Sequence, residues 1–188
     1  MPPVLTPSPP RNGASQLTWP PMFRFSVEQY HDLIHKEVLA SGEPVELLEG
    51  LLVTKMTRNP SHRIALAHLR DLLVTRMTDN WHLETQEAIT LESSEPEPDL
   101  TVVRGQVDDY PDRHPSAADV ALVVEVSDST LVYDRGIKRR IYARAGIAEY
   151  WIVKGTSSET FGPQAGSLCH VAKSHGKIAD RSAIRTWW

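Results

Sequence analysis

The sequence predicts an α/β or α+β domain built around a mixed β-sheet. Two observations lead to this fold class: helical and strand-like patterns follow one another along the chain, and residues 121–126 are nearly all apolar. Alternating helices and strands are typical of a sheet with helices packed on its faces. A short, almost continuous apolar run is typical of a central strand that is buried on both faces. The 188 residues are enough for one such domain with tails.

Composition excludes several classes of protein. Asp and Glu (24) outnumber Lys and Arg (20), and the net charge of −4 argues against a basic protein that coats nucleic acid, although a nuclease with a local basic patch stays compatible. Cys169 is the only cysteine, so an intrachain disulfide and a cysteine-rich zinc site are excluded. The sequence shows neither the pattern of a secretory signal nor a run of about 18 apolar residues for a membrane helix. We therefore expect a cytoplasmic protein.

Three segments differ in character. Residues 1–21 contain seven of the fourteen prolines and are expected to form a disordered, partly polyproline-II tail, with Met22 as an alternative natural start. Residues 22–153 carry the helix and strand patterns and are expected to form the folded domain. Residues 154–188 are rich in Ser, His, Gly and Lys without clear alternation, so we expect a divergent or irregular C-terminal extension.

The first half of the domain begins with a helix, because Ser26 and Gln29 form the pattern of a capping box. Residues 45–53 indicate a β-hairpin or a strand, with the turn at Gly50. A long helix is then expected over residues 62–77, with Ser61 as its cap. Its apolar stripe comprises Ile64, Leu66, Leu69, Leu72, Leu73 and Met77.

The second half holds most of the expected sheet. Strands are predicted over residues 82–91, 100–103, 121–126 and 149–153, with a polar loop over residues 105–119. A helix is predicted over residues 133–145, and Gly146 is in the usual position directly after a helix.

Two acidic residues lie next to the predicted strands. Asp99 follows Pro98, which keeps the chain extended and delays strand pairing, so the carboxylate is expected at the rim of the sheet. Glu125 lies near the end of the apolar strand, where a buried carboxylate is costly unless it is paired or bound to a metal. A Mg²⁺ ion bound by Asp99, Glu125, a backbone carbonyl such as that of Val126 and water would meet that cost.

Each acid also has a simpler interpretation. Glu125 could be satisfied by a hydrogen bond to Ser127, which points to the same face of the strand. Asp99 could be a turn-forming residue that follows a proline. The residues alone leave both alternatives open.

The predicted helix over residues 133–145 places Asp134, Lys138 and Tyr142 on one face, because they are four residues apart. Two carboxylates and an amine that converge at a sheet edge are what metal-dependent phosphodiester cleavage requires. The alternative interpretation is a surface ion pair between Asp134 and Lys138, worth roughly 0.3–0.5 kcal/mol, with Tyr142 at the edge of the core.

Two further features are weaker candidates. Glu46 could be a third carboxylate near the metal, but a solvated strand residue is the favoured interpretation. His62 and His68 are six residues apart on the predicted long helix and therefore do not share a face, which argues against metal binding by that pair.

At these residues the chain resembles the Uma-two family of predicted restriction endonucleases, within the PD-(D/E)XK nuclease superfamily. The matching stretch runs from about residue 23 to residue 153. The segments that carry the resemblance are Glu46-Leu47-Leu48-Glu49-Gly50, Ser61-His62, Pro98-Asp99, Glu125-Val126-Ser127, Asp134 with Lys138 and Tyr142, and Gly146 with Glu149-Tyr150-Trp151.

The resemblance implies a restriction-endonuclease-like core, a mixed central sheet flanked by helices, with metal ligation by Asp99 and Glu125. The superfamily usually has a lysine two residues after the second acid, where this chain has Ser127. The implied substitute is Lys138, on the following helix. The family usually continues with further strands after residue 154, and none can be matched here.

The function we expect from the residues and the resemblance together is a Mg²⁺-dependent endonuclease that hydrolyses DNA, with Mn²⁺ as a substitute metal. Catalysis is assigned to Asp99, Glu125 and Lys138, and support to Glu46, Asp134 and Tyr142. One alternative is a catalytically degenerate module that binds nucleic acid or a protein partner. Another is a small metal-dependent hydrolase that acts on a different phosphoester. Superfamily members often act as dimers, which leaves a homodimer open.

Overall fold

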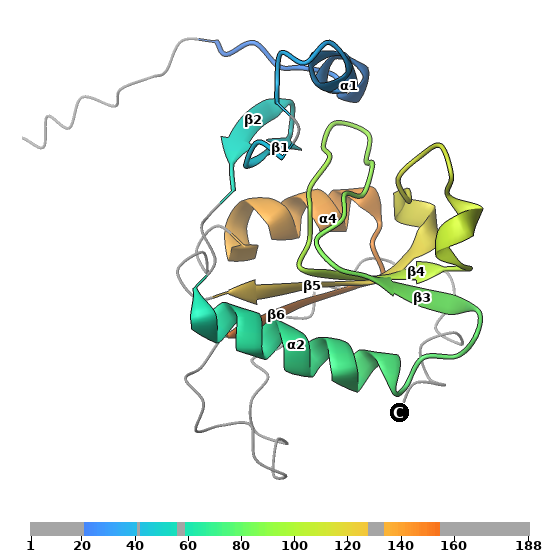
Figure 1. The fold of residues 1–188 in the computed structure, drawn as a ribbon. Helices are drawn as coiled ribbons and strands as arrows, with labels where there is room; N and C mark the ends of the chain where they lie inside the picture. The colour runs from blue at the N-terminus through green and yellow to red at the C-terminus, as the bar shows by residue number, and fades with distance from the viewer. Residues whose placement is uncertain (1–20, 41, 56–58, 128–133, 155–188) are drawn as a thin grey trace, which may run out of the picture.

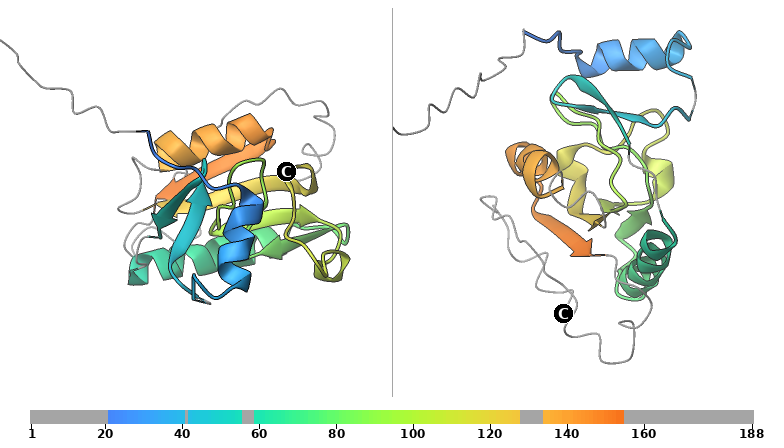
Figure 2. Two further views of the ribbon diagram at one scale, coloured as in Figure 1. Left: turned by 90° about the horizontal axis from the view of Figure 1, so that it is seen from above. Right: turned by 90° about the vertical axis from the view of Figure 1, so that its left-hand side faces the viewer.

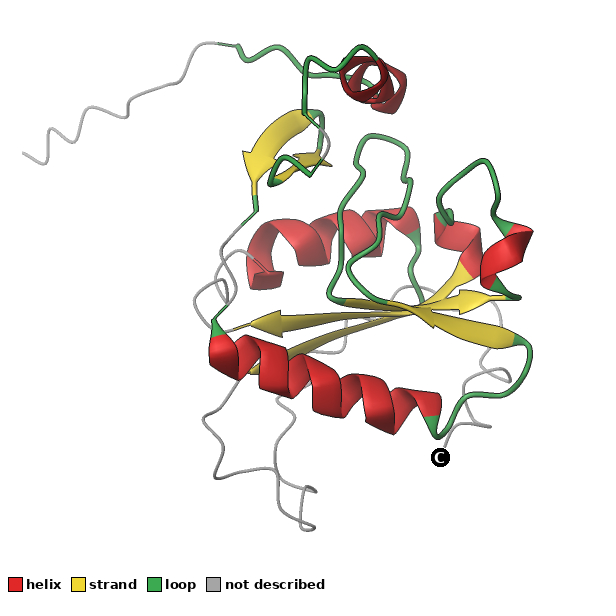
Figure 3. Ribbon diagram, in the orientation of Figure 1, coloured by secondary structure: helices red, strands yellow, loops and turns green. Residues whose placement is uncertain are grey.

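The structure is a computed structural model, and it describes residues 21–40, 42–55, 59–127 and 134–154. These residues form a four-stranded sheet with helix α2 (Pro60–Val74) on one face and helix α4 (Arg139–Ala145) on the other (Figure 1). Figure 3 shows this layering by element type. The α/β class and the mixed central sheet flanked by helices are therefore confirmed.

The order of strands across the sheet is β3-β4-β5-β6. Strand β4 pairs antiparallel with both β3 and β5, and β6 pairs parallel with β5. The parallel pair needs a crossover, which α4 supplies between the two strands. The strand bounds are β3 Trp81–Glu84, β4 Leu100–Arg104, β5 Val120–Ser127 and β6 Glu149–Lys154.

A smaller layer lies beside the α4 face of the sheet and contains helix α1 (Val27–His35) and the hairpin of β1 (Val45–Leu48) and β2 (Leu51–Thr54) (Figure 2). The turn residues Glu49 and Gly50 both have positive φ, 48° and 80°, as tight hairpin turns that match the strand twist require.

The hairpin is fixed to the loop that precedes β4. The backbone N–H of Glu95 donates to the carbonyl of Leu47 (2.7 Å), and the N–H of Gly50 donates to the carbonyl of Ser93 (2.9 Å). These bonds hold β1, and with it Glu46, against the loop that leads into Asp99.

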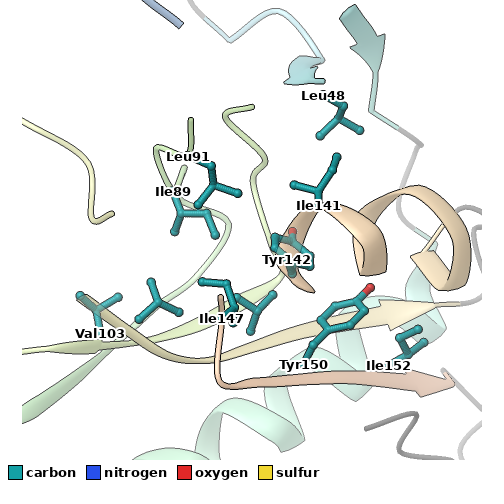
Figure 4. Close-up of a cluster of buried hydrophobic side chains, with 11 residues drawn as sticks. Leu48, Ile89, Leu91, Val103, Ile141, Tyr142, Ile147, Tyr150 and Ile152 are labelled. Carbon is teal, nitrogen blue, oxygen red and sulfur yellow. The ribbon is translucent and has the colours of Figure 1, made fainter. Parts of the chain in front are cut away.

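The core is divided by the sheet into two clusters. On the α2 side, Ala65, Leu69 and Leu73 pack against apolar side chains of β4 and β5. The α4 side is shown in Figure 4, where aromatic and aliphatic side chains from α4, β6 and the loop before β4 pack together. Its buried members are Leu48, Ile89, Leu91, Val103, Val120, Val123, Ile141, Tyr142, Ile147, Tyr150 and Ile152.

Most of the predicted elements are present, with two corrections. Helix α2 begins at Pro60 and is capped by Asn59, whose side chain accepts from the N–H of His62 (2.9 Å), so Ser61 is not the cap. The strand predicted over residues 82–91 ends at Glu84, because Gln86 has a φ of 62° and its N–H bonds the carbonyl of Asp99. The chain then leaves the sheet as an irregular loop.

The second half agrees more closely with the sequence prediction. Strand β5 is buried over nearly its whole length, and Gly146 ends α4 with a left-handed φ of 79°. The start of the predicted helix is a π-helical turn, η3 (Asp134–Lys138), that leads into α4. The polar loop contains two 3₁₀ turns, η1 (Val107–Asp109) and η2 (Ala117–Asp119).

The expected N-terminal tail and C-terminal extension fall almost entirely outside the described residues and stay predictions. Within the described part of the chain, the helices are too short or too polar to cross a lipid bilayer.

Candidate active site

The two predicted acids meet at one edge of the sheet. Because β4 and β5 are antiparallel, with Leu100 opposite Val124, the start of β4 lies beside the end of β5. Asp99 and Glu125 are the next residues outward, and both are buried, with 6% and 5% exposure. The N–H of Val126 donates to Oδ2 of Asp99 (2.8 Å), so the second strand fixes the first acid directly.

Lys138 reaches the same edge from η3. Its Nζ donates to Oε1 of Glu125 (2.9 Å) and lies 3.4 Å from Oε1 of Glu46. Lys138 is 7% exposed. It is therefore not a surface residue, and the alternative interpretation of an exposed Asp134–Lys138 ion pair is wrong in this respect. The side chain of Asp134 lies outside what the structure describes.

Tyr142, one helical turn beyond Lys138, makes a second contact with Glu125. Its hydroxyl donates to Oε1 of Glu125 (3.0 Å), and its ring is fully buried against Tyr150, with centroids 4.9 Å apart. Burial, followed by the charge of Glu125, raises the pKa of Tyr142 well above its ordinary value. The phenol therefore stays protonated and acts as a donor.

Glu46 belongs to this cluster, contrary to its favoured interpretation as a solvated strand residue. It is 3% exposed, because the hairpin presses β1 against the loop before β4. Its Oε2 accepts from the N–H of Glu97 (3.1 Å), and its Oε1 faces Lys138. Strand alternation alone did not reveal this, since the covering loop lies about fifty residues further along the chain.

His62 is the residue that the sequence analysis missed. It lies in the first turn of α2, is 8% exposed, and places Nε2 3.0 Å from Oδ2 of Asp99. His68 is exposed on the same helix, so the two histidines do not converge, as their spacing predicted. A usable signal did exist in the sequence. His62, Ala65, Leu69 and Leu73, which form the buried side of α2, follow one another at helical spacings of three or four residues.

The charges of the cluster leave an excess of negative charge. Glu46, Asp99 and Glu125 are buried, and the ammonium of Lys138, which is also buried, contacts Glu46 and Glu125. Counted formally, these three carboxyl groups and the one lysine carry a net charge of −2. Carboxylate oxygens are the ligands that Mg²⁺ prefers, and Mg²⁺ often uses one or two of them together with water.

A metal ion that needs three or more side-chain ligands fits this cluster less well than one that takes two carboxylates and water. Among the described residues, no group of three or more His, Cys, Asp or Glu side chains is arranged to hold an ion. Two carboxylates, such as those of Asp99 and Glu125, would suit a hard cation that keeps water among its ligands better than a closed structural zinc site, which needs four protein ligands.

Comparison with known proteins places the chain in a family. A family model described as "Uma2: Putative restriction endonuclease" matches residues 27–183. The chain belongs to the Uma2 family. The resemblance found in the sequence is thus confirmed, and the Uma2 match includes all five clustered residues and His62. It also extends about thirty residues past 153, where the sequence analysis found no corresponding strands.

One solved structure is also similar to this Uma2 chain. It is described as a crystal structure of a putative nuclease belonging to DUF820 from Anabaena variabilis. The two chains are 13% identical, the match covers 60% of this chain and 67% of the other, and the TM-score is 0.45. A search of curated proteins returned no match.

Proposed function

We propose that this Uma2 protein is a metal-dependent endonuclease that hydrolyses DNA phosphodiester bonds. The observation that carries the proposal is the cluster at the sheet edge, where Asp99, Glu125 and Glu46 are all buried and the ammonium of Lys138 contacts Glu125 and Glu46. Buried carboxylates are rare unless they are paired or bound to a metal. Membership of a restriction-endonuclease-like family supports a phosphodiester as the substrate.

Asp99 and Glu125 would hold the cation, which we propose to be Mg²⁺ with Mn²⁺ as a substitute. When bound, such an ion polarises the phosphate and lowers the pKa of a bound water. The chain contributes the orientation of its ligands: Val126 fixes Asp99, and Tyr142 and Lys138 fix Glu125. Ligands that are held by hydrogen bonds before the substrate arrives need less reorganisation during the reaction.

Lys138 is the group that would act on the reacting atoms. Its ammonium is held at the metal ligand Glu125, where it can neutralise charge that develops on the phosphate or orient the attacking water. Glu46 holds the other side of the ammonium and is proposed to position it. Asp134 stays a predicted supporting residue.

A second candidate is a module that binds nucleic acid or a protein partner without catalysis. The observation that favours it is the position of Lys138, whose ammonium already compensates part of the carboxylate charge. A cluster of this kind can be purely structural if no divalent cation enters it.

The two candidates are separated by plasmid nicking in Mg²⁺ or Mn²⁺, with EDTA as the metal-free arm. The variants are Asp99→Asn and Glu125→Gln, and Asp32→Asn is the control, because Asp32 is an exposed carboxylate on α1. Nicking by the native protein and the control, and its loss in EDTA and in both site variants, supports the nuclease.

If the native protein is folded but does not nick DNA in either metal, the nuclease proposal is wrong and the non-catalytic binding module is the remaining candidate. Thermal unfolding in the same metals adds an independent readout, since a ligand at a hundredfold excess over its Kd stabilises the folded state by about 2.7 kcal/mol.

A further inference from the structure

We infer that His62 is a positioning residue that sets the orientation of the Asp99 carboxylate, a role that rests on the proposed function of Asp99 as a metal ligand. The inference starts from the two hydrogen bonds on Oδ2 of Asp99. One comes from the N–H of Val126 in β5, and the other is the contact of 3.0 Å with His62 Nε2. Both described contacts use the same carboxylate oxygen.

Two donors from different elements hold the carboxylate more firmly than one. The Val126 bond alone would allow Asp99 to rotate about the bonded oxygen, whereas a second donor from α2 fixes the carboxylate plane. With Oδ2 held in this way, the direction of Oδ1 is also fixed. Metal sites commonly rely on outer hydrogen bonds of this kind to orient their ligands, and losing such a bond typically weakens metal affinity or activity about 10- to 100-fold.

The chemistry of the pair determines which nitrogen carries the proton. A carboxylate oxygen only accepts hydrogen bonds, so Nε2 of His62 is the protonated donor. The other ring nitrogen, Nδ1, is buried and has no hydrogen-bond partner in the described part of the structure. The hydrogen bond of Nε2 therefore holds the ring in place, whereas Nδ1 is buried without a hydrogen bond that would offset the loss of its hydration.

This unpartnered nitrogen also argues against a purely structural role. The buried side of α2 otherwise consists of Ala65, Leu69 and Leu73, and an apolar side chain at position 62 would continue that packing. A buried polar atom without a partner costs about 1–3 kcal/mol. The bond that His62 donates to Asp99 explains why a histidine occupies this position in the first turn of α2 in spite of that cost.

The unequal nitrogens allow a sharp test with matched variants. In His62→Gln the amide nitrogen can reach the place of Nε2, and in His62→Asn it reaches only the place of Nδ1. His62→Leu removes both, and His68→Leu is the control on the exposed side of the same helix. Each full-length variant is measured for Mn²⁺ affinity by calorimetry, for plasmid nicking and for thermal stability.

The expected result is that His62→Leu and His62→Asn weaken Mn²⁺ binding and nicking by about 10- to 100-fold. Their unfolding temperatures should also fall, since the bond to the buried carboxylate of Asp99 is lost, so affinity and nicking are compared at a temperature at which every variant is folded. His62→Gln should retain most of both activities, and His68→Leu should retain all. The inference is overturned if His62→Leu binds Mn²⁺ as well as the native protein, or if His62→Gln is as impaired as His62→Leu.

A readout on the native protein covers the case in which variants fail to fold. Long-range ¹H–¹⁵N correlation spectra distinguish the two tautomers of histidine, and we expect a protonated Nε2 for His62. A proton on Nδ1 alone would overturn the inference. A native protein that neither binds Mn²⁺ nor nicks DNA would instead overturn the proposed function, and the inference with it.

Discussion

The Nζ atom of Lys138 lies 2.9 Å from Oε1 of Glu125, inside the protein, and this contact joins η3 to the end of β5. Both side chains are less than a tenth exposed. Taking two charges out of water is costly, and the cost is recovered only while both partners are present. The pair should therefore respond very differently to the loss of one partner and to the loss of both.

Lys138→Met is expected to lower the free energy of unfolding by about 3–5 kcal/mol, because it leaves buried carboxylates without their cation. The double variant Lys138→Met, Glu125→Gln should be more stable than Lys138→Met alone, because it removes one of these charges. Urea unfolding of the two variants and of the native protein measures the difference.

The stability of Lys138→Met in the presence of a divalent metal ion is a second test of the buried pair. If a cation enters the cluster, Mg²⁺ should stabilise Lys138→Met more than it stabilises the native protein, since it replaces the missing positive charge. A cost for Lys138→Met below about 1 kcal/mol, the range of exposed ion pairs, would contradict the buried pair described here.

Tyr142→Phe is expected to destabilise the fold by about 1.5–3 kcal/mol, the usual worth of a hydrogen bond to a charged group. The substitution removes only the donor to Glu125 and keeps the ring, which packs against Tyr150. Tyr110→Phe is the matched control, because the Tyr110 hydroxyl bonds the carbonyl of Arg104 in an exposed position, where water can replace it. Equal costs in the two variants, measured by urea unfolding, would refute this account of Tyr142.

The parts of this fold that could be predicted from the sequence are those with local signals. The apolar run that forms β5, the turn at Gly50 and the helix end at Gly146 each depend on a few neighbouring residues. The loop before β4 could not be predicted in this way. Residues 86–91 look like a strand, but they form bonds within their own loop, such as that from the N–H of Ile89 to the carbonyl of Pro96.

The same division applies to the candidate site. Asp99 and Glu125 could be singled out because each follows or interrupts a recognisable local pattern. The burial of Glu46 and the contact of His62 could not, since both depend on partners at least 37 residues away in sequence. The search for histidine ligands paired His62 with His68 on one helix, whereas the actual partner of His62 is a residue outside that helix.

Asn59→Ala is expected to cost about 1 kcal/mol of stability, the typical worth of a helix N-cap, because the Asn59 side chain accepts from the N–H of His62. Ser61, the cap expected from the sequence, instead donates its hydroxyl to the Asn59 side chain (2.7 Å). Ser61→Ala should therefore cost less. Thermal unfolding of both variants tests the assignment, and a larger loss for Ser61→Ala would reverse it.

Asp119, in the turn that leads into β5, gives the fold a dependence on pH. Burial alone would raise the pKa of Asp119, but hydrogen bonds from Arg113 and from Ser116 outweigh it and lower the pKa from 3.8 to about 2. A carboxyl whose pKa is lower in the folded state stabilises the protein fully above its unfolded value and loses that contribution as the pH falls. The loss should therefore occur between pH 3.8 and about 2.

Asp119→Asn should accordingly destabilise the protein at pH 7 by about 1 kcal/mol, a modest value because the Arg113 partner is exposed and screened by solvent. The difference between variant and native protein should shrink when urea unfolding is repeated at pH 3. Arg113→Gln serves as the matched control, since it removes one of the donors to Asp119 and should show a smaller change with the same pH dependence. A difference that stays constant from pH 7 to pH 3 would mean that the charge of Asp119 does not stabilise this turn.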